Sequence, residues 1–320
     1  MKIVFLDSDT LLHPIRAQPW VTEWVNYSWT PQNTAAVVAA IGDAEICLTN
    51  KIRITADILD QCPGLRFICV AATGFDCVDV AAAHKRGIVV SNVPGYSKQS
   101  VAESVIGYLF ALRRQLMRYA KLGVQAWPEA RHFCIHDRPI ADIRASTLGI
   151  VGQGAIGSEV ARLAQALGIE VLFAEHRGRA DVRAGYCGFD EVLAKADVIS
   201  LHCPLTPSTR GLIGQTEIAR MKPGALLINT ARGPLVDEAA LIEGLGSGHL
   251  GGAALDVLSQ EPPEKDNGLL TLDHPNLIVT PHIAWAATEG QRLLAQGIEA
   301  NLAAFDAGKP INVVAPAPAN

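Results

Sequence analysis

Short apolar runs separated by turn-forming residues alternate with helical patterns along most of the chain. The first group of runs lies at residues 3–6, 45–48, 65–70 and 87–90. Runs of this length are typical of buried strands, and strands that alternate with helices indicate a parallel sheet covered on both faces. The first hundred residues therefore predict one α/β unit.

A long helical pattern follows from Val101 to about Lys121, with Ser100 as the expected N-cap and Glu103 completing a capping box. After a less regular segment at residues 123–142, a second series of strands and helices begins. Its six predicted strands lie at residues 147–151, 170–174, 197–202, 225–229, 252–257 and 277–280. A last helical pattern covers residues 288–305, and we expect the tail after Val314 to fray.

The composition supports a two-domain globular protein. The chain has 320 residues, of which 49% are hydrophobic and 18% charged, and a formal net charge of −5 without a cluster of Lys and Arg. Nucleic-acid binding is therefore disfavoured. The first residues do not resemble a signal peptide, and no run of 18 apolar residues predicts a membrane span. The seven cysteines are scattered without a CxxC pair, which indicates free thiols in a reducing cytoplasm and no metal site.

The most informative local motif runs from Gly152 to Gly157 and includes Gly154, Ala155 and Ile156. A predicted strand precedes this GxGxxG pattern and a predicted helix follows it, as in dinucleotide-binding folds. Gly152 permits a tight turn, Gly154 lets a pyrophosphate approach the backbone, and Gly157 lets the helix pack closely on the strand. The N–H groups at the helix start would then bind the phosphates.

Glu175, at the end of the next predicted strand, bears on the choice of cofactor. A carboxylate at this place accepts hydrogen bonds from the ribose hydroxyls and repels a 2′-phosphate, which favours NAD. Arg177 follows closely and could pair with a 2′-phosphate, so NADP stays possible.

Arg232, Glu261 and His282 each follow a predicted strand of the second series. The carboxyl ends of parallel strands line the ligand crevice, so these side chains can converge. The planar guanidinium can bind a substrate carboxylate through two N–H donors. A protonated imidazole can give its proton to a carbonyl oxygen as hydride arrives, and a carboxylate can orient that imidazole. The set suits the reduction of a 2-oxo acid.

Longer motifs carry a resemblance to a known family over nearly the whole chain. The most specific cover residues 201–206, 221–224, 229–237, 255–263 and 274–285. The chain resembles the D-isomer-specific 2-hydroxyacid dehydrogenases. Residues 1–10, 71–76 and 92–97 are similar to the glycerate dehydrogenase/hydroxypyruvate reductase branch.

The resemblance implies roles for further residues. Arg232, Glu261 and His282 would carry the catalytic roles, and the backbone of Ala72, Thr73 and Gly74 would help to hold the substrate carboxylate. Asp256 would bond the nicotinamide carboxamide. The remaining residues implied to line the cofactor are Cys203, Pro204 and Thr230.

The same resemblance implies the architecture: an α/β protein with two doubly wound parallel-sheet domains. Residues 1–100 and 288–320 would form a flavodoxin-like substrate domain, with the active site in a cleft beside a Rossmann coenzyme domain at residues 101–287. Within it, an arm at residues 101–144 would embrace a second subunit, so a homodimer is expected.

The expected reaction is NAD-dependent, reversible hydride transfer with a small 2-oxo acid, with hydroxypyruvate and glyoxylate as the leading substrates. Formate dehydrogenases typically have Gln at the position of Glu261, and phosphoglycerate dehydrogenases often carry a regulatory domain that is absent here. A different class is a corepressor-like, NAD(H)-sensing scaffold of the same superfamily. Such scaffolds usually carry a long disordered tail, and turnover of a 2-oxo acid would separate the two classes.

Overall fold

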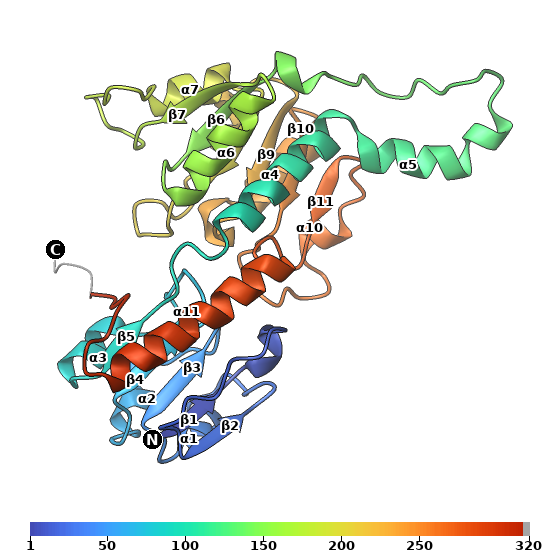
Figure 1. Cartoon of the computed structure of the whole chain (residues 1–320). Coiled ribbons are helices and arrows are strands. Elements are labelled where there is room, and N and C mark those ends of the chain that lie inside the picture. Colours follow the sequence, from blue (N-terminus) through green and yellow to red (C-terminus); the bar gives the residue numbers. More distant parts are fainter. Residues whose placement is uncertain (316–320) are drawn as a thin grey trace. The chain divides into compact units, whose positions relative to one another are not determined.

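A computed structural model describes residues 1–315 of the chain, and its elements are labelled in Figure 1. The backbone divides into two compact units. One comprises Met1–Ser97 together with the described part of Ala286–Asn320, and the other comprises Lys98–Trp285. Among the described residues, no helix is long and apolar enough to cross a membrane. Most of the tail that was expected to fray lies outside the described residues.

The first unit contains a five-stranded parallel sheet in the order β2-β1-β3-β4-β5. This is the 2-1-3-4-5 order of flavodoxin-like folds. The strands are β1 (Lys2–Phe5), β2 (Glu23–Asn26), β3 (Ile46–Thr49), β4 (Phe67–Val70) and β5 (Val89–Ser91). The helices between them are α1 (Thr34–Ile41), α2 (Ala56–Asp60) and α3 (Val80–Lys85).

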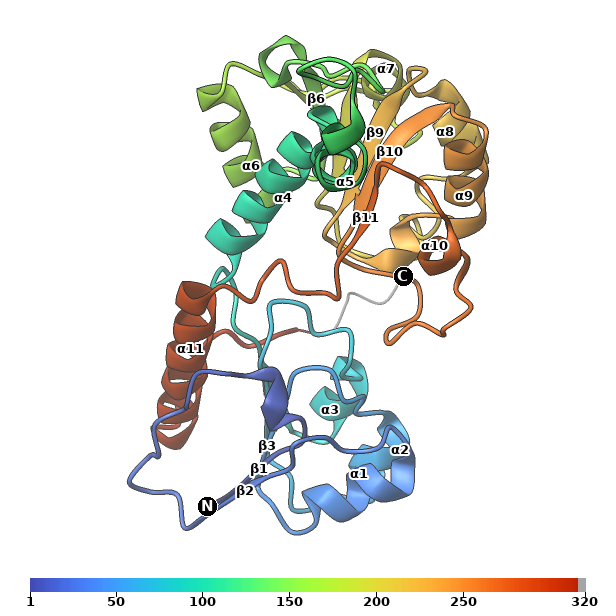
Figure 2. The same cartoon turned by 90° about the vertical axis from the view of Figure 1, so that its right-hand side faces the viewer.

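The helix α11 (Thr288–Asp306) returns to this unit and covers the face of the sheet opposite α1, α2 and α3 (Figure 2). Phe305 at its end stacks on Phe67 of β4 with ring centroids 4.4 Å apart. Its buried Asn301 donates to the carbonyl of Asn92 at 2.8 Å. The helix therefore fixes the loop that follows β5.

The second unit contains a six-stranded parallel sheet in the order β11-β10-β9-β8-β6-β7. Its strands are β6 (Thr147–Val151), β7 (Glu170–Ala174), β8 (Val198–Leu201), β9 (Ala225–Asn229), β10 (Leu250–Leu255) and β11 (Leu277–Val279). Cys187 adds one parallel bridge to Ala174 beyond β7. If that bridge is counted as a short third strand between β7 and β8 in sequence, the sheet has the 3-2-1-4-5-6 order of dinucleotide-binding folds. β11 is then one further strand beyond the sixth, β10.

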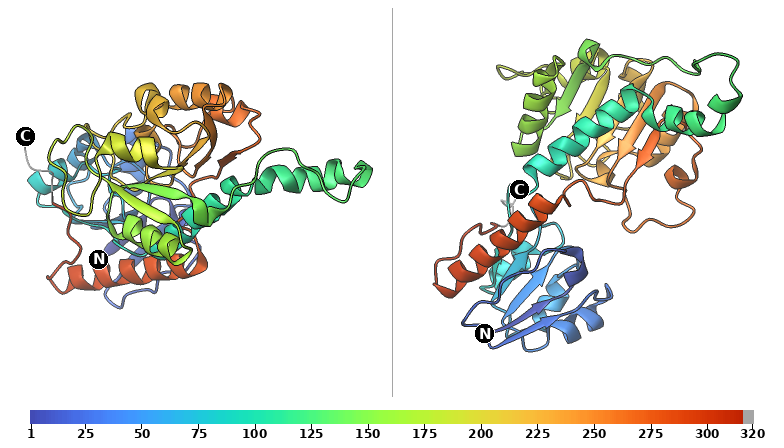
Figure 3. Two further views of the ribbon diagram at one scale, coloured as in Figure 1. Left: turned by 90° about the horizontal axis from the view of Figure 1, so that it is seen from above. Right: turned by 45° about the vertical axis from the view of Figure 1, so that its right-hand side comes forward.

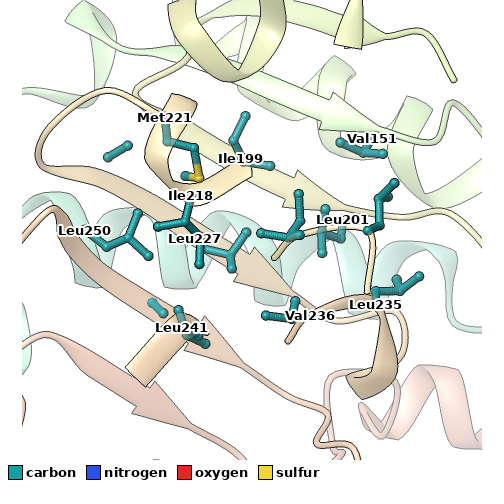
Figure 4. Close-up of a cluster of buried hydrophobic side chains, with 14 of the residues drawn as sticks. Val151, Ile199, Leu201, Ile218, Met221, Leu227, Leu235, Val236, Leu241 and Leu250 are labelled. Carbon is teal, nitrogen blue, oxygen red and sulfur yellow. The ribbon is translucent and has the colours of Figure 1, made fainter. Parts of the chain in front are cut away.

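Helices cover both faces of this sheet (Figure 2). The helices of the unit are α4 (Lys98–Arg113), α5 (Leu116–Gln125), α6 (Ala155–Ala166), α7 (Phe189–Lys195), α8 (Gln215–Arg220), α9 (Glu238–Gly246) and α10 (Gly268–Thr271), and all but α5 pack near the sheet. On one face, α4 and α6 bury aliphatic side chains against β6, β8 and β9. On the other, the core shown in Figure 4 joins α7, α8 and α9 to the same strands. The predicted fold class, two doubly wound parallel sheets, is confirmed.

The structure corrects two sequence predictions and adds one strand. The predicted helix from Val101 to Lys121 is two helices, because Gln115 between α4 and α5 adopts a left-handed conformation with φ 52°. The predicted capping box is wrong, since α4 begins at Lys98 and places Ser100 inside the helix, where it is buried. β2 was not predicted.

The segment from α5 to residue 142 extends away from the sheet of its own unit (Figures 1 and 3). Polar contacts hold it together internally. Arg118 pairs with Asp137 through two bonds of 2.9 and 3.0 Å, and the Tyr119 hydroxyl donates to the carbonyl of Arg138 at 2.7 Å. None of the residues of α5 is buried.

Candidate active site

The glycine-rich turn joins β6 to α6, as predicted. Gly152 has φ 103°, a conformation that side-chain-bearing residues rarely adopt. A Cβ atom on Gly157 would lie 2.1 Å from the Gly152 carbonyl oxygen, so α6 packs directly on the turn. A Cβ on Gly154 would instead meet no atom within 4 Å among the described residues. α6 begins at Ala155 without a side-chain cap.

The segment after β8 lies against this turn. A Cβ on Gly152 would come within 2.6 Å of the Cys203 backbone nitrogen, so Cys203 and the glycine turn are neighbours. Burial raises the pKa of the Cys203 thiol to about 11, which keeps it protonated. His202 precedes it and bonds Ser200 Oγ at 2.8 Å, and burial lowers its pKa to about 4. Pro204 is exposed.

Glu175 follows β7, as predicted, but its partners come from its own loop. Arg183 donates to its carboxylate through Nε at 2.6 Å and Nη2 at 2.8 Å. The backbone N–H groups of His176 and Arg183 donate to the same carboxylate at 2.8 and 3.2 Å. The Glu175 side chain is fully buried, and the Arg183 guanidinium holds its pKa down to about 2. A ribose contact would therefore require Arg183 to move.

Arg177, the predicted partner of a 2′-phosphate, turns toward α8. Its Nη1 atom lies 3.5 Å from Oε1 of Glu217 and 3.4 Å from the carbonyl of Leu212. Sequence reasoning singled out Arg177 because it stands close to Glu175 in the chain. Arg183, which contacts Glu175, was missed because it lies eight residues further along the chain, and the loop folds back to bring the two side chains together.

Arg232 lies in a tight turn after β9 that Asn229 organises. The Asn229 amide donates to the carbonyl of Arg232 at 2.8 Å, and its oxygen accepts from the N–H of Ala231 at 3.0 Å. Within this turn the hydroxyl of Thr230 is buried without a hydrogen-bond partner among the residues described. A buried hydroxyl in that state needs a partner, which a bound ligand can supply.

The turn of Arg232 packs directly on the loop that carries Glu261. A Cβ on Gly233 would lie 2.0 Å from the backbone of Leu258, so only glycine permits this approach. The N–H of Leu258 in turn donates to Oε1 of Glu261 at 3.0 Å. The backbone thus brings the Arg232 and Glu261 segments together.

Glu261 and His282 form the central pair. Oε2 of Glu261 lies 2.7 Å from Nδ1 of His282, and both side chains remain partly exposed, at 35% and 24%. The contact fixes the Nδ1 side of the ring and leaves Nε2 for another partner. His282 has φ 54°, and its carbonyl accepts from the Trp285 indole at 2.8 Å. Strained backbone of this kind persists where surrounding contacts enforce it.

Asp256 supplies those contacts. Its Oδ1 accepts from the N–H of Ile283 at 2.9 Å and from the Thr280 hydroxyl at 2.7 Å, and its Oδ2 accepts from the N–H of Ala284 at 2.9 Å. Thr280 also bonds the hydroxyl of Tyr108 in α4 at 2.7 Å. The buried Asp256 therefore holds the loop around His282, in addition to the cofactor role that was predicted for it.

The predicted substrate-binding backbone lies in the first unit, at the carboxyl end of β4. The N–H of Val93 donates to the carbonyl of Ala72 at 3.0 Å, and the Asn92 amide donates to the carbonyl of Thr73 at 2.6 Å. The Thr73 hydroxyl reaches the carbonyl of Val93 at 3.1 Å. These bonds fix the loop through Gly74.

The second unit fits a dinucleotide on two observations: the start of α6 at Gly154, which has open space and no side-chain cap, and the hydroxyl of Thr230, which is unpartnered among the described residues. An α/β fold with a dinucleotide turn and an acid–base pair at the strand ends defines a nicotinamide-dependent oxidoreductase.

Comparisons with known proteins define the family. The family model described as "D-isomer specific 2-hydroxyacid dehydrogenase, NAD binding domain" matches residues 106–284. A putative 2-hydroxyacid dehydrogenase of Haemophilus influenzae is 46% identical over 95% of this chain and 98% of its own. The glycerate dehydrogenase of Methylorubrum extorquens is 46% identical over 98% of both chains. The chain belongs to the D-isomer-specific 2-hydroxyacid dehydrogenase family, and its cofactor is NAD(P).

A solved structure agrees with this assignment. The NADPH-dependent glyoxylate/hydroxypyruvate reductase of Sinorhizobium meliloti, determined with NADP and malonate, superposes with a TM-score of 0.82. It is 28% identical over 98% of this chain and 96% of its own.

Proposed function

We propose that this protein is a D-2-hydroxyacid dehydrogenase that reduces hydroxypyruvate and glyoxylate to D-glycerate and glycolate, and that it also catalyses the reverse reactions. The observation that carries the proposal is the 2.7 Å contact between Glu261 and His282 beside the turn of Arg232. The substrate class rests on the likeness to the glycerate dehydrogenase of Methylorubrum extorquens.

In this mechanism Arg232, Glu261 and His282 each have one task. Arg232 binds the substrate carboxylate through two parallel N–H donors, which orients the 2-oxo group. His282 donates the proton on Nε2 to the carbonyl oxygen, and Glu261 stabilises the charged imidazole through Nδ1. The bound cofactor supplies or accepts the hydride. Asp256 and Thr280 hold the backbone that presents the imidazole.

The cofactor-binding residues remain part of the proposal. Gly152, Gly154, Ala155, Ile156 and Gly157 would bind the pyrophosphate through the start of α6. The unpartnered Thr230 hydroxyl would bond the cofactor, and Cys203 and Pro204 would line it. Asp256 keeps one acceptor position for the carboxamide, because a carboxylate accepts about four hydrogen bonds and this one accepts three. Ala72, Thr73 and Gly74 would hold the substrate carboxylate.

Turnover of small 2-oxo acids tests the function. Oxidation of NADH and NADPH would be followed by absorbance with hydroxypyruvate, glyoxylate, pyruvate and phenylpyruvate in parallel. We expect rapid oxidation with the first two, and a loss of roughly 10²–10⁴-fold in His282→Ala. Tight cofactor binding without turnover of any substrate would contradict the proposal and favour an NAD(H)-sensing scaffold.

The proposal also includes a cytoplasmic homodimer formed by the arm at residues 101–144, chiefly by the part of it that follows α4. Large apolar side chains on this arm are exposed: Leu116 50%, Met117 60%, Val124 80%, Trp127 55% and Phe133 90%. Exposed apolar side chains that gather on one segment, held together by its own polar contacts, are typical of a protein–protein interface. A second copy is the occupant that fits, because most soluble oligomers are symmetric homo-oligomers.

Light scattering after size exclusion tests the dimer. We expect twice the chain mass for the wild type and a shift toward monomer in Val124→Glu/Phe133→Glu. The control Val182→Glu changes a valine that is 41% exposed outside the arm. A monomeric wild type, or a double variant that stays dimeric, would contradict this assignment.

A further inference from the structure

Asp7, a buried acidic residue of the first unit, lies two residues after β1. Its Oδ1 accepts from the N–H of Asn50 at 2.8 Å, and its Oδ2 accepts from the N–H groups of Lys51 at 2.7 Å and Ile52 at 3.3 Å. These donors belong to the loop after β3, which we call the β3 loop (residues 50–54). Burial raises the pKa of Asp7, and the three bonds act in the opposite direction. Because a buried carboxylate must be surrounded by donors, the contact fixes the backbone of the β3 loop.

The β3 loop lies beside the loop after β4. We call the latter the substrate loop (residues 72–76), because it contains the backbone proposed to hold the substrate carboxylate. Just before the substrate loop, the N–H of Ala71 donates to the carbonyl of Thr49 at 2.8 Å. Just after it, the carbonyl of Cys77 accepts from the N–H of Ile54 at 2.8 Å. The end of β3 and the β3 loop therefore hold the substrate loop at both of its ends.

Two more contacts strengthen the connection between these loops. The Cys77 thiol donates to the carbonyl of Asn50 at 3.7 Å, and the N–H of Asp79 donates to the carbonyl of Ile54 at 2.9 Å. Asn50 is thus bound by Asp7 at its N–H and by Cys77 at its carbonyl. The strands β1, β3 and β4 are parallel neighbours, so their carboxyl ends lie at one edge of the sheet.

The loop after β5 holds the substrate loop independently. The N–H of Val93 and the side chain of Asn92 donate to the carbonyls of Ala72 and Thr73, as described above. The conformation of the substrate loop therefore depends on two neighbouring loops. Asp7 fixes one of them and has no printed bond to the other.

From these contacts we infer that Asp7 is a positioning residue for substrate binding. Its carboxylate holds the β3 loop, and the β3 loop holds the substrate loop in the conformation that binds the carboxylate of the 2-oxo acid. The buried side chain acts through backbone groups and does not touch the substrate. The inference rests on the proposed function and adds a residue, outside every motif of the sequence, on which the affinity for substrate depends.

Steady-state kinetics of Asp7→Ala with hydroxypyruvate test this role. We expect KM to rise by about 10- to 100-fold, the range for hydrogen bonds to a charged group, with kcat changing less than about threefold. The dissociation constant for NADH, measured by fluorescence titration, should stay the same because the proposed cofactor residues lie in the other unit. Turnover of glycolaldehyde should also stay nearly the same, since this substrate has no carboxylate for the substrate loop to bind.

Asp7→Asn is the conservative variant and keeps the test decisive if Asp7→Ala does not fold. The amide keeps the shape of the side chain and one accepting oxygen, but its own N–H groups face the remaining backbone donors. We therefore expect a smaller rise in KM, about 3- to 10-fold, which is a partial rescue relative to Asp7→Ala.

Arg86→Ala is the matched control for a general loss of stability in the same unit. Arg86 follows α3, donates to the carboxylate of Asp60 at 3.0 Å and to the carbonyl of Ala82 at 2.8 Å, and lies outside the β3 loop and the substrate loop. Its removal should lower the temperature of unfolding and leave KM for hydroxypyruvate unchanged.

Two results would overturn the inference alone: a folded Asp7 variant with the KM of the wild type, or an Asp7 variant whose kcat/KM falls by the same factor with glycolaldehyde as with hydroxypyruvate. A rise in KM in Arg86→Ala would also count against it, because instability alone would then explain the effect. A wild type that turns over neither hydroxypyruvate nor glyoxylate would overturn the proposed function as well.

Discussion

The Nδ1 atom of His282 lies 2.7 Å from Oε2 of Glu261, and Oε1 of the same carboxylate accepts the backbone N–H of Leu258 at 3.0 Å. The carboxylate is therefore oriented at one oxygen by the backbone and at the other by the imidazole. This relationship leads to the first of four predictions.

Glu261→Gln should lower the reduction rate at neutral pH by about tenfold or more, a part of the 10²–10⁴-fold that a positioned general acid contributes. The amide cannot stabilise the protonated imidazole, so the alkaline limb of the reductive pH–rate profile should move to lower pH. The measurement is kcat for hydroxypyruvate against pH. An unmoved limb would count against the pairing.

Arg232→Lys should lower kcat/KM for hydroxypyruvate by about 10- to 100-fold, because an ammonium group cannot reproduce a bidentate contact with the carboxylate. Glycolaldehyde, which lacks the carboxylate, serves as the control substrate. Its slow turnover should be nearly the same in both proteins. An equal loss with both substrates would show that Arg232 does not bind the carboxylate.

Tyr108→Phe tests the chain of contacts from α4 through Thr280 to Asp256. Removing one hydrogen bond should destabilise the ordered conformation of the loop around His282 by about 0.5–1.5 kcal/mol. We expect kcat to fall a few-fold while the dissociation constant for NADH stays the same. Thr280→Val removes the bonds to both Tyr108 and Asp256 and should lower kcat further, whereas Thr280→Ser keeps a hydroxyl and should have a rate close to that of the wild type. A change in NADH binding without a change in kcat would contradict the positioning role.

His202 should make the folded protein less stable as the pH falls. Burial lowers its pKa from 6.5 to about 4, so between these values the unfolded chain binds a proton that the folded chain does not. The free energy of unfolding then decreases with falling pH by up to about 1.4 kcal/mol per unit. Urea unfolding at several pH values should show a shallower slope in His202→Asn than in the wild type. The exposed His132→Asn is the control, and equal slopes in all three proteins would refute the prediction.

The sequence predicted the strands well because most of them are continuous apolar runs buried on both faces. The exception is β2, at the edge of its sheet, where Glu23 and Asn26 are exposed and the apolar pattern is weak. The break after α4 was missed because it occurs at Gln115, a good helix former, and not at Gly or Pro.

Motif spacing predicted that Arg232, Glu261 and His282 each follow a strand of the same sheet, and in the structure they follow β9, β10 and β11. It could not identify the residues that hold them. Asn229 and Asp256 act through bonds to backbone groups, and Gly233 acts through a close approach to Leu258 that no residue pattern encodes. The pairing of Glu175 with Arg183 depends on the path of a loop, which periodicity does not describe.

Among the described residues, the sheet continues beyond β7 through one bridge, between Ala174 and Cys187. Residues 176–186 therefore form no continuous pairing with the sheet. The length and charge of this loop can change without disturbing the fold of the unit. We therefore expect cofactor preference and catalysis to be separable in this protein: a graft confined to that loop should change the preference between NADH and NADPH and leave Arg232, Glu261 and His282 in place.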